Sequence, residues 1–159
     1  MSTDSPKERD LGQTSDLSIV IVAARYNSKL IDSLLEQTIQ SLKESGVEHI
    51  TVERVPGSAE LACAAHLIEK TLTMDALIAL GVVIAGETEH HNVIAYSSAQ
   101  ALNQLSADKD LPVINGIIVT NTIKEAEDRC GTAINRGREF AQAAIEMAHL
   151  NRLWNQKKN

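Results

Sequence analysis

The sequence of 159 residues contains only two cysteines, Cys63 and Cys130, which are too few for a framework of disulfide bonds. Aromatic residues make up only 3 %, so the core has to be built from Ala, Val, Ile and Leu. No apolar run approaches the roughly 20 residues that a membrane-spanning helix needs. Residues 1–16 are polar and lack an apolar signal segment, so we expect a cytoplasmic protein with no membrane contact.

Several motifs of common ligand-binding and catalytic folds are also missing. The sequence has no GxGxxG after its first apolar run, no GxxxxGK[ST] and no GxSxG. Dinucleotide binding, P-loop nucleotide binding and a serine nucleophile elbow are therefore not expected. The net charge is −6 and no stripe of Lys and Arg is visible, so we do not expect a nucleic-acid partner.

Few residues suggest metal or thiol chemistry. His90, His91 and Glu87 could in principle bind a metal, but neighbouring residues on a helix do not face each other and the sequence offers no second cluster of ligands. We therefore expect no metal site. Cys63 lies in an Ala-rich helical pattern and is expected in the core, and Cys130 has no nearby partner that would make it reactive.

Apolar runs and helical patterns alternate along residues 17–159, after a tail at residues 1–16 that we expect to be disordered. This alternation predicts a single α/β domain, a three-layer, flavodoxin-like sandwich with a four-stranded parallel sheet and helices on both faces. Asn115 and Gly116 interrupt the last strand, which suggests a bulge or a close approach of the backbone. The predicted strands are 17–24, 49–55, 75–84 and 112–120, and the predicted helices are 28–46, 58–72, 87–106, 122–129 and 135–153.

Three of the predicted helices carry an apolar stripe with helical spacing, and in the helix over 58–72 it consists of Leu61, Ala65, Ile68 and Leu72. Such a stripe marks the face that a helix turns toward the core. In the helix over 28–46 the stripe consists of Ile31, Leu34, Leu35, Ile39 and Leu42, and in the helix over 135–153 it consists of Phe140, Ala144, Met147, Leu150 and Trp154.

Ligands of parallel α/β sheets bind beyond the carboxyl ends of the strands, which directs attention to the turns there. In the turn AGETEHH, Gly86 allows the chain to turn tightly, and the N–H groups of Glu87 and Thr88 would point outward at the start of a helix. Such N–H groups form an anion site. The nearby glutamates oppose an anion, so a cation has to come from elsewhere. His90 would follow in the first helical turn, where an imidazole could transfer protons near neutral pH.

Each of these turns also has a simpler interpretation. AGETEHH can be a capped helix start with two surface histidines, and PGSAE can be a helix start with Ser58 as its N-cap. In the functional interpretation, PGSAE offers backbone donors and acceptors to a flat polar heterocycle, and Tyr26 stacks on that ring. Taken one at a time, the turns leave both interpretations open.

Taken together, the turns resemble the lumazine synthase family over residues 17–150. The segments that carry the resemblance are RYN at 25–27, RVPGSAEL at 54–61, ALGVVIAGETEHH at 79–91, PVINGIIVTNTIKEAEDRCG at 112–131 and EMA at 146–148. The resemblance implies an enzyme that condenses 5-amino-6-(D-ribitylamino)uracil with 3,4-dihydroxy-2-butanone 4-phosphate. The products are 6,7-dimethyl-8-ribityllumazine, phosphate and water, and no metal or organic cofactor takes part.

The resemblance also implies roles for individual residues. His90 matches the proton-transferring histidine, and Arg129 matches an arginine that reaches the phosphate from the adjacent subunit of a pentameric ring. The phosphate would be held by Glu87, Thr88 and Arg129. The pyrimidine and its ribityl chain would contact Tyr26, Ser58, Ala59, Glu60, Val82, Val83, Ile84 and Asn115.

The sequence departs from the family pattern at several positions. Ala85 stands in place of an arginine, Ala59 in place of a bulky aromatic, and Asn115 in place of a phenylalanine. His91 stands where an aromatic residue is usual, and could stack. The loop over 131–137 is shorter than usual and brings Arg136 near a common lysine position. That loop bears on whether pentamers remain single, pair into decamers or form an icosahedral capsid of 60 subunits.

Alternative functions follow from the same resemblance. The chain could be a flavin- or lumazine-binding relative without catalysis, or a relative whose role is to form a shell. Riboflavin synthase is a conceivable partner besides the homo-oligomer. An unrelated flavodoxin-like binding module would instead be a monomer.

Overall fold

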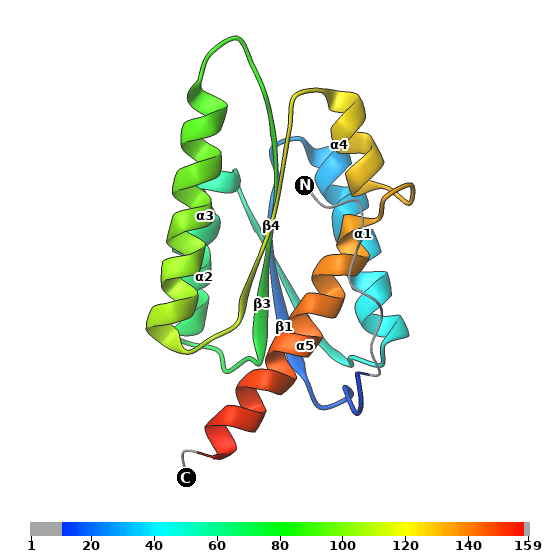
Figure 1. Cartoon of the computed structure of the whole chain (residues 1–159), viewed down its shortest axis with the longest axis vertical. Coiled ribbons are helices and arrows are strands. Elements are labelled where there is room, and N and C mark those ends of the chain that lie inside the picture. The colour runs from blue at the N-terminus through cyan, green and yellow to red at the C-terminus, as the bar shows by residue number, and fades with distance from the viewer. Residues whose placement is uncertain (1–10, 158–159) are drawn as a thin grey trace.

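A computed structural model describes residues 11–157 of the chain. Its four strands form one all-parallel sheet in the order β2-β1-β3-β4 (Figure 1). The predicted α/β fold class is confirmed. The strands are β1 (Ser18–Ala24), β2 (His49–Val55), β3 (Ala76–Ile84) and β4 (Val113–Thr120).

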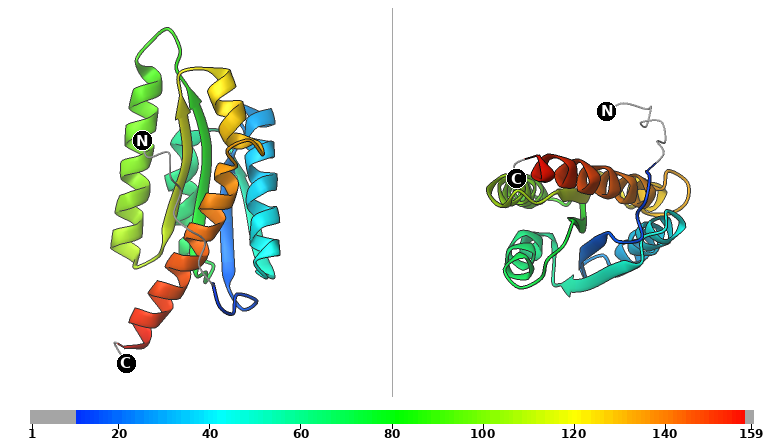
Figure 2. Two further views of the ribbon diagram at one scale, coloured as in Figure 1. Left: turned by 45° about the vertical axis from the view of Figure 1, so that its right-hand side comes forward. Right: turned by 90° about the horizontal axis from the view of Figure 1, so that it is seen from below.

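Helices cover both faces of the sheet, as the alternating pattern predicts (Figure 2). α2 and α3 pack on one face, and α1, α4 and α5 pack on the other. The helices are α1 (Ser28–Glu44), the 3-10 turn η1 (Ser58–Glu60), α2 (Leu61–Glu69), α3 (His90–Lys109), α4 (Ile123–Cys130) and α5 (Arg136–Gln156). In residues 11–157, none of these helices has the length and hydropathy to cross a membrane.

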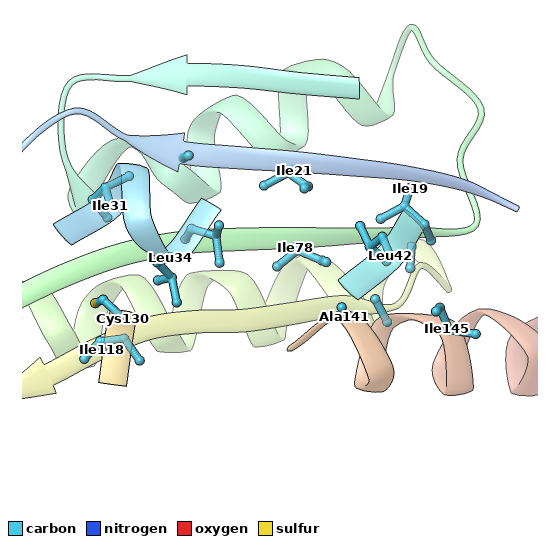
Figure 3. Packing of buried hydrophobic residues seen from close by; sticks show 14 of the residues in the cluster. Ile19, Ile21, Ile31, Leu34, Leu42, Ile78, Ile118, Cys130, Ala141 and Ile145 are labelled. Carbon is cyan, nitrogen blue, oxygen red and sulfur yellow. The ribbon is translucent and has the colours of Figure 1, made fainter. Parts of the chain in front are cut away.

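The two central strands supply side chains to both layers of the core. Along β1, Ile19 and Ile21 belong to the cluster under α1, α4 and α5, while Val20 and Val22 belong to the cluster under α2 and α3. This split follows from the alternation of side chains along a strand. Figure 3 shows part of the larger cluster, in which Ile78 of β3 lies among side chains from β1, α1 and α5.

The apolar stripe of α1 is confirmed, whereas the predicted stripe of α5 is confirmed only at Phe140 and Ala144 and is wrong for its last three residues. Met147, Leu150 and Trp154 are exposed. The buried face instead consists of small residues and one isoleucine, namely Gly137, Ala141, Ala144, Ile145 and Ala148. The reason is the close packing of α5 on α1: a Cβ on Gly137 would lie 2.8 Å from Thr38 N and 2.9 Å from Leu34 O. Small side chains are needed where backbones approach this closely.

The interruption at Asn115 and Gly116 is a close approach and not a bulge. β4 pairs with β3 without a break, with Asn115 opposite Ala79 and Gly116 opposite Leu80. A Cβ on Gly116 would lie 2.9 Å from the Ala79 carbonyl oxygen and 3.1 Å from a ring carbon of Phe140. The absence of a side chain at Gly116 therefore allows α5 to pack closely against the sheet.

An ion-pair cluster of Arg152, Asp75 and Asp16 joins α5 to the amino-terminal edge of the sheet. Arg152 Nε donates to Asp75 Oδ1 at 2.6 Å, and another guanidinium nitrogen donates to Asp16 Oδ2 at 2.6 Å. The hydrogen bond from Arg152 holds the pKa of Asp16 below its ordinary value. Asp75 also accepts the N–H of Ser18 at 2.8 Å, so the cluster connects α5 with the starts of β1 and β3.

Part of the predicted tail contacts the domain. Residues 1–10 lie outside the described residues, so their predicted disorder stays a prediction. Of the next six residues, Thr14 is buried and bonds through its hydroxyl to the carbonyl of Ser45, and Asp16 pairs with Arg152.

The two cysteines occupy different environments. Cys130 at the end of α4 is buried, and burial raises the pKa of its thiol to about 11. Cys63 is exposed, so the prediction that it lies in the core is wrong. The Ala-rich pattern of α2 does not distinguish its faces, because small residues occur all around the helix.

We expect Cys130 to resist thiol reagents in the folded protein. Almost none of a thiol with a pKa of about 11 is thiolate at pH 8. In a Cys63→Ser variant, a disulfide reagent at pH 8 should leave the native protein unmodified and should label one thiol per chain in guanidinium. Rapid labelling of the native variant would contradict the burial of Cys130.

Candidate functional site

A cavity of about 480 Å³ lies where β1, β2 and β3 end. This is the edge of the sheet at which ligands of parallel α/β proteins bind. Of the predicted site residues, it brings together Tyr26, Ser58, Ala59, Val82, Val83, Ile84, Thr88 and His90. Its other lining residues are Asn27, Gly57, Gly86, His91 and Ile94.

The turn after β1 presents Tyr26 to the cavity. The Tyr26 N–H donates to the Pro56 carbonyl at 3.0 Å, which fixes this turn beside the turn after β2. The ring itself is 75 % exposed, so it is available to a ligand. Asn27 follows with φ of 59°, a left-handed conformation that asparagine tolerates better than most residues. Its Nδ2 donates to the Val82 carbonyl at 3.0 Å and thereby links β1 to the end of β3.

Sequence reasoning assigned no role to Asn27, although it belongs to the RYN segment. The short turn between β1 and α1 contains no proline or glycine. An asparagine in such a turn is a signal for a residue with left-handed backbone conformation. Its amide group then becomes free to reach a neighbouring strand. The signal was therefore present, but its partner at Val82 depends on strand order and could not be read from residue types.

The turn after β2 forms the floor of the cavity with β3. Ser58 is buried, and it packs so closely on Gly81 that a Cβ there would lie 2.5 Å from the Ser58 Oγ. Gly81 is therefore needed by the contact between η1 and β3. The Glu60 carboxylate accepts the Gly57 N–H at 2.8 Å, so it caps its own turn and does not line the cavity.

The loop after β3 differs from the prediction, because α3 begins at His90 and not near Glu87. The ring nitrogen Nδ1 of His91 lies 2.8 Å from the Thr88 carbonyl oxygen. The N–H of Asn92, which would bond to Thr88 in a longer helix, donates instead to the Glu89 carbonyl at 3.0 Å. The Thr88 carbonyl thus faces the ring of His91 and accepts no backbone bond from Asn92.

Backbone donors remain available in this loop. Within residues 11–157, no hydrogen bond uses the N–H of Glu87 or of Thr88. They precede the positive end of α3, which is 20 residues long. Gly86 does not have a positive φ, so its backbone conformation does not require a glycine. A Cβ there would meet no protein atom within 4 Å, because Gly86 faces open space at the cavity.

His90 is the first residue of α3 and is exposed in the chain. It lines the cavity together with Thr88 and His91. The imidazole can therefore reach a ligand in the cavity, and a histidine is suited to accept and return a proton near neutral pH.

Four predicted site residues do not line this cavity: Glu60, Glu87, Asn115 and Arg129. Asn115 lies in the middle of β4, where its Oδ1 accepts the Ile117 N–H at 3.1 Å. Arg129 lies on α4, which packs on the face opposite η1, α2 and α3, and it donates to the Glu125 carbonyl at 2.9 Å. Within one chain, these two residues and the cavity are separate.

The cavity has donors for an anion but no strong cation. Its lining residues include neither lysine nor arginine, and its only basic side chains are His90 and His91. Within residues 11–157, no three His, Cys, Asp or Glu side chains gather as metal ligands would. That no metal or cofactor takes part stays a prediction.

Comparison with known proteins agrees with this site. Residues 16–152 match the family model described as 6,7-dimethyl-8-ribityllumazine synthase. The chain is also 41 % identical over 142 residues to the 6,7-dimethyl-8-ribityllumazine synthase of Thermotoga petrophila, covering 86 % of this chain and 84 % of that protein. The match to the family model includes all the turns around the cavity and all of α4. The chain therefore belongs to the 6,7-dimethyl-8-ribityllumazine synthase family and condenses 5-amino-6-(D-ribitylamino)uracil with 3,4-dihydroxy-2-butanone 4-phosphate in riboflavin biosynthesis.

Proposed function

We propose that the cavity at the ends of β1, β2 and β3 is the active site, and that His90 transfers protons there. The observation that carries this proposal is the placement of the exposed His90 imidazole in the same cavity lining as Thr88, whose backbone N–H is unbonded in residues 11–157. The condensation joins an amine to a ketone, and it releases water and phosphate. Both leaving steps need a proton acceptor and donor near the reacting carbons, which a single imidazole provides.

The pyrimidine substrate is placed on the side of the cavity that the first two turns form. Tyr26 stacks on the ring, while Ser58 and Ala59 bind the ribityl chain and the edge of the ring. The backbone at Val82, Val83 and Ile84 completes this wall. An exposed aromatic side chain beside fixed backbone groups suits a flat, polar heterocycle.

The phosphate substrate is placed at the loop over 86–89. The N–H groups of Glu87 and Thr88 donate to the phosphate oxygens, and the dipole of α3 favours the negative charge. This arrangement brings the phosphate next to His90, so the leaving group and the proton carrier meet. Holding two substrates in one cavity also lowers the barrier of a reaction between two molecules.

The missing cation is Arg129 of a neighbouring subunit. The cavity lining contains no lysine or arginine, and Arg129 of the same chain lies on the other face of the sheet. A guanidinium that bonds to a phosphate gives strong, charge-assisted hydrogen bonds. Asn115, which also lies away from the cavity of its own chain, would reach the pyrimidine from the neighbour in the same way. We therefore propose a ring of five subunits with active sites shared between neighbours.

Replacing Arg129 with alanine is expected to raise KM for the phosphate substrate by about tenfold to a hundredfold, the factor for a lost charge-assisted hydrogen bond. KM for the pyrimidine should change little, and steady-state kinetics with each substrate varied in turn measures both. Lys124→Ala is the matched control, because it removes one positive charge from the same helix, where Lys124 pairs with Asp128. A higher pyrimidine KM with an unchanged phosphate KM would show that Arg129 does not bind phosphate.

Mixing two impaired variants, assayed at a low concentration of the phosphate substrate, tests whether the sites are shared. His90→Ala chains and Arg129→Ala chains, unfolded together and reassembled, should regain activity, because some interfaces then combine His90 of one chain with Arg129 of another. A site contained within one chain predicts no regain. Analytical ultracentrifugation of the same samples gives the size of the assembly and separates a pentamer from a decamer, a 60-subunit shell or a monomer.

A further inference from the structure

The second histidine of the loop makes a contact that stacking alone does not require. His91 lines the cavity, is half-buried, and places Nδ1 2.8 Å from the Thr88 carbonyl oxygen. A carbonyl oxygen can only accept a hydrogen bond, so Nδ1 carries the proton. This bond is compatible with both the neutral and the charged imidazole.

The bond lies at the point where α3 begins. In a helix that started one residue earlier, the Thr88 carbonyl would accept the N–H of Asn92. Instead the ring of His91 occupies that carbonyl, and the Asn92 N–H donates to Glu89 at 3.0 Å. The residues before His90 therefore stay outside the helix.

This local geometry leaves backbone donors free where the proposed function needs them. A trans peptide points its C=O and N–H in opposite directions. Holding the Thr88 carbonyl toward the first turn of α3 therefore turns the N–H of the same peptide, that of Glu89, away from that turn. The same bond fixes the peptide between Thr88 and Glu89, which lies next to the unbonded N–H groups of Glu87 and Thr88.

We propose that His91 is a positioning residue: its Nδ1–H holds the Thr88 carbonyl and keeps the loop over 86–89 in the form that binds the phosphate of the substrate. This inference rests on the proposed function, in which that loop holds the phosphate. It assigns to His91 a hydrogen bond that an aromatic hydrocarbon ring at the same position could not make.

Two substitutions of His91 separate the hydrogen bond from stacking. Phenylalanine keeps a flat ring and removes the donor, whereas asparagine removes the ring and places its Nδ2 near the position of Nδ1. His91→Phe should raise KM for the phosphate substrate, and the inhibition constant of inorganic phosphate, by about fivefold, the factor for one hydrogen bond. His91→Asn should return both constants to near the wild-type values, and kcat should change less than either.

Asn92→Ala is the matched control. It removes the bond from Asn92 Nδ2 to the Glu89 carboxylate, which is 2.6 Å long and lies at the same helix start, but leaves the Thr88 carbonyl bonded. Both phosphate constants should remain at wild-type values in this variant. A His91→Phe variant with unchanged constants, or a His91→Asn variant no better than His91→Phe, would overturn the inference.

Arg129→Ala, measured in the same series, keeps this inference separate from the proposed function. If Arg129→Ala raises KM for the phosphate substrate and His91→Phe does not, the phosphate site stands and the positioning role of His91 fails. If neither variant changes the phosphate constants, the assignment of phosphate to this loop fails as well. A rise in His91→Phe that His91→Asn reverses supports the positioning role whatever Arg129→Ala shows.

Discussion

Replacing His90 with alanine is expected to lower kcat by about 10²- to 10⁴-fold, the usual contribution of a general acid–base group. The fold should not change, because His90 is exposed at the first position of α3 and its side chain makes no hydrogen bond with the described residues. Steady-state formation of the lumazine product, followed by its absorbance, measures the rate, and analytical ultracentrifugation checks the assembly.

A second exposed histidine provides the control for this experiment. His49 starts β2 at the amino-terminal edge of the sheet, away from the cavity. His49→Ala should therefore retain the wild-type kcat. An unchanged kcat in His90→Ala would remove His90 from the mechanism, whereas binding of both substrates without turnover in the wild-type protein would favour a non-catalytic relative.

Replacing Gly137 with alanine is expected to destabilise the protein by about 2–3 kcal/mol, the range for overpacking. At an ordinary helix position this change is favourable by roughly 0.5–1 kcal/mol, so the sign of the effect is informative. The added Cβ would lie 2.8 Å from Thr38 N and 2.9 Å from Leu34 O, and the backbone of α1 can give way only if the helices separate. Urea unfolding of the variant and the wild type measures the difference.

The matched control is the same substitution at Gly86. A Cβ there meets no protein atom within 4 Å, so Gly86→Ala should change the free energy of unfolding by less than about 0.5 kcal/mol. If Gly137→Ala is as stable as Gly86→Ala, then α1 and α5 do not pack as closely as described. Gly86→Ala should also raise KM for the phosphate substrate, because its methyl group enters the cavity.

The sheet could be predicted from the sequence because its strands are continuous apolar runs. In β3, eight of nine residues are buried, and a short apolar run of this kind is typical of a strand that is covered on both faces. The α5 stripe could not be predicted, since large apolar residues usually mark a buried face. Besides the predicted Ala144, close packing on α1 selected Gly137 and Ala141, and it left Trp154 exposed.

The site could be predicted in part because the predicted strands also locate the turns that follow them. The turns are next to strand ends in the sequence, so Tyr26, Ser58 and His90 were placed at one edge and the structure brings them to one cavity. The start of α3 at His90 could not be predicted, because a hydrophobic pattern does not record local hydrogen bonds such as the one between His91 and the Thr88 carbonyl. The roles of Asn115 and Arg129 depend on a second chain and remain predictions.

The ion-pair cluster of Arg152, Asp75 and Asp16 has a practical consequence for engineering. It lies before β1 and β3, while the cavity lies beyond the opposite ends of these strands. The all-parallel sheet thus places these ion pairs and the cavity at opposite ends of the same strands. Variants with higher thermal stability can therefore be sought by substitutions around Arg152, which leave the residues that line the cavity unchanged.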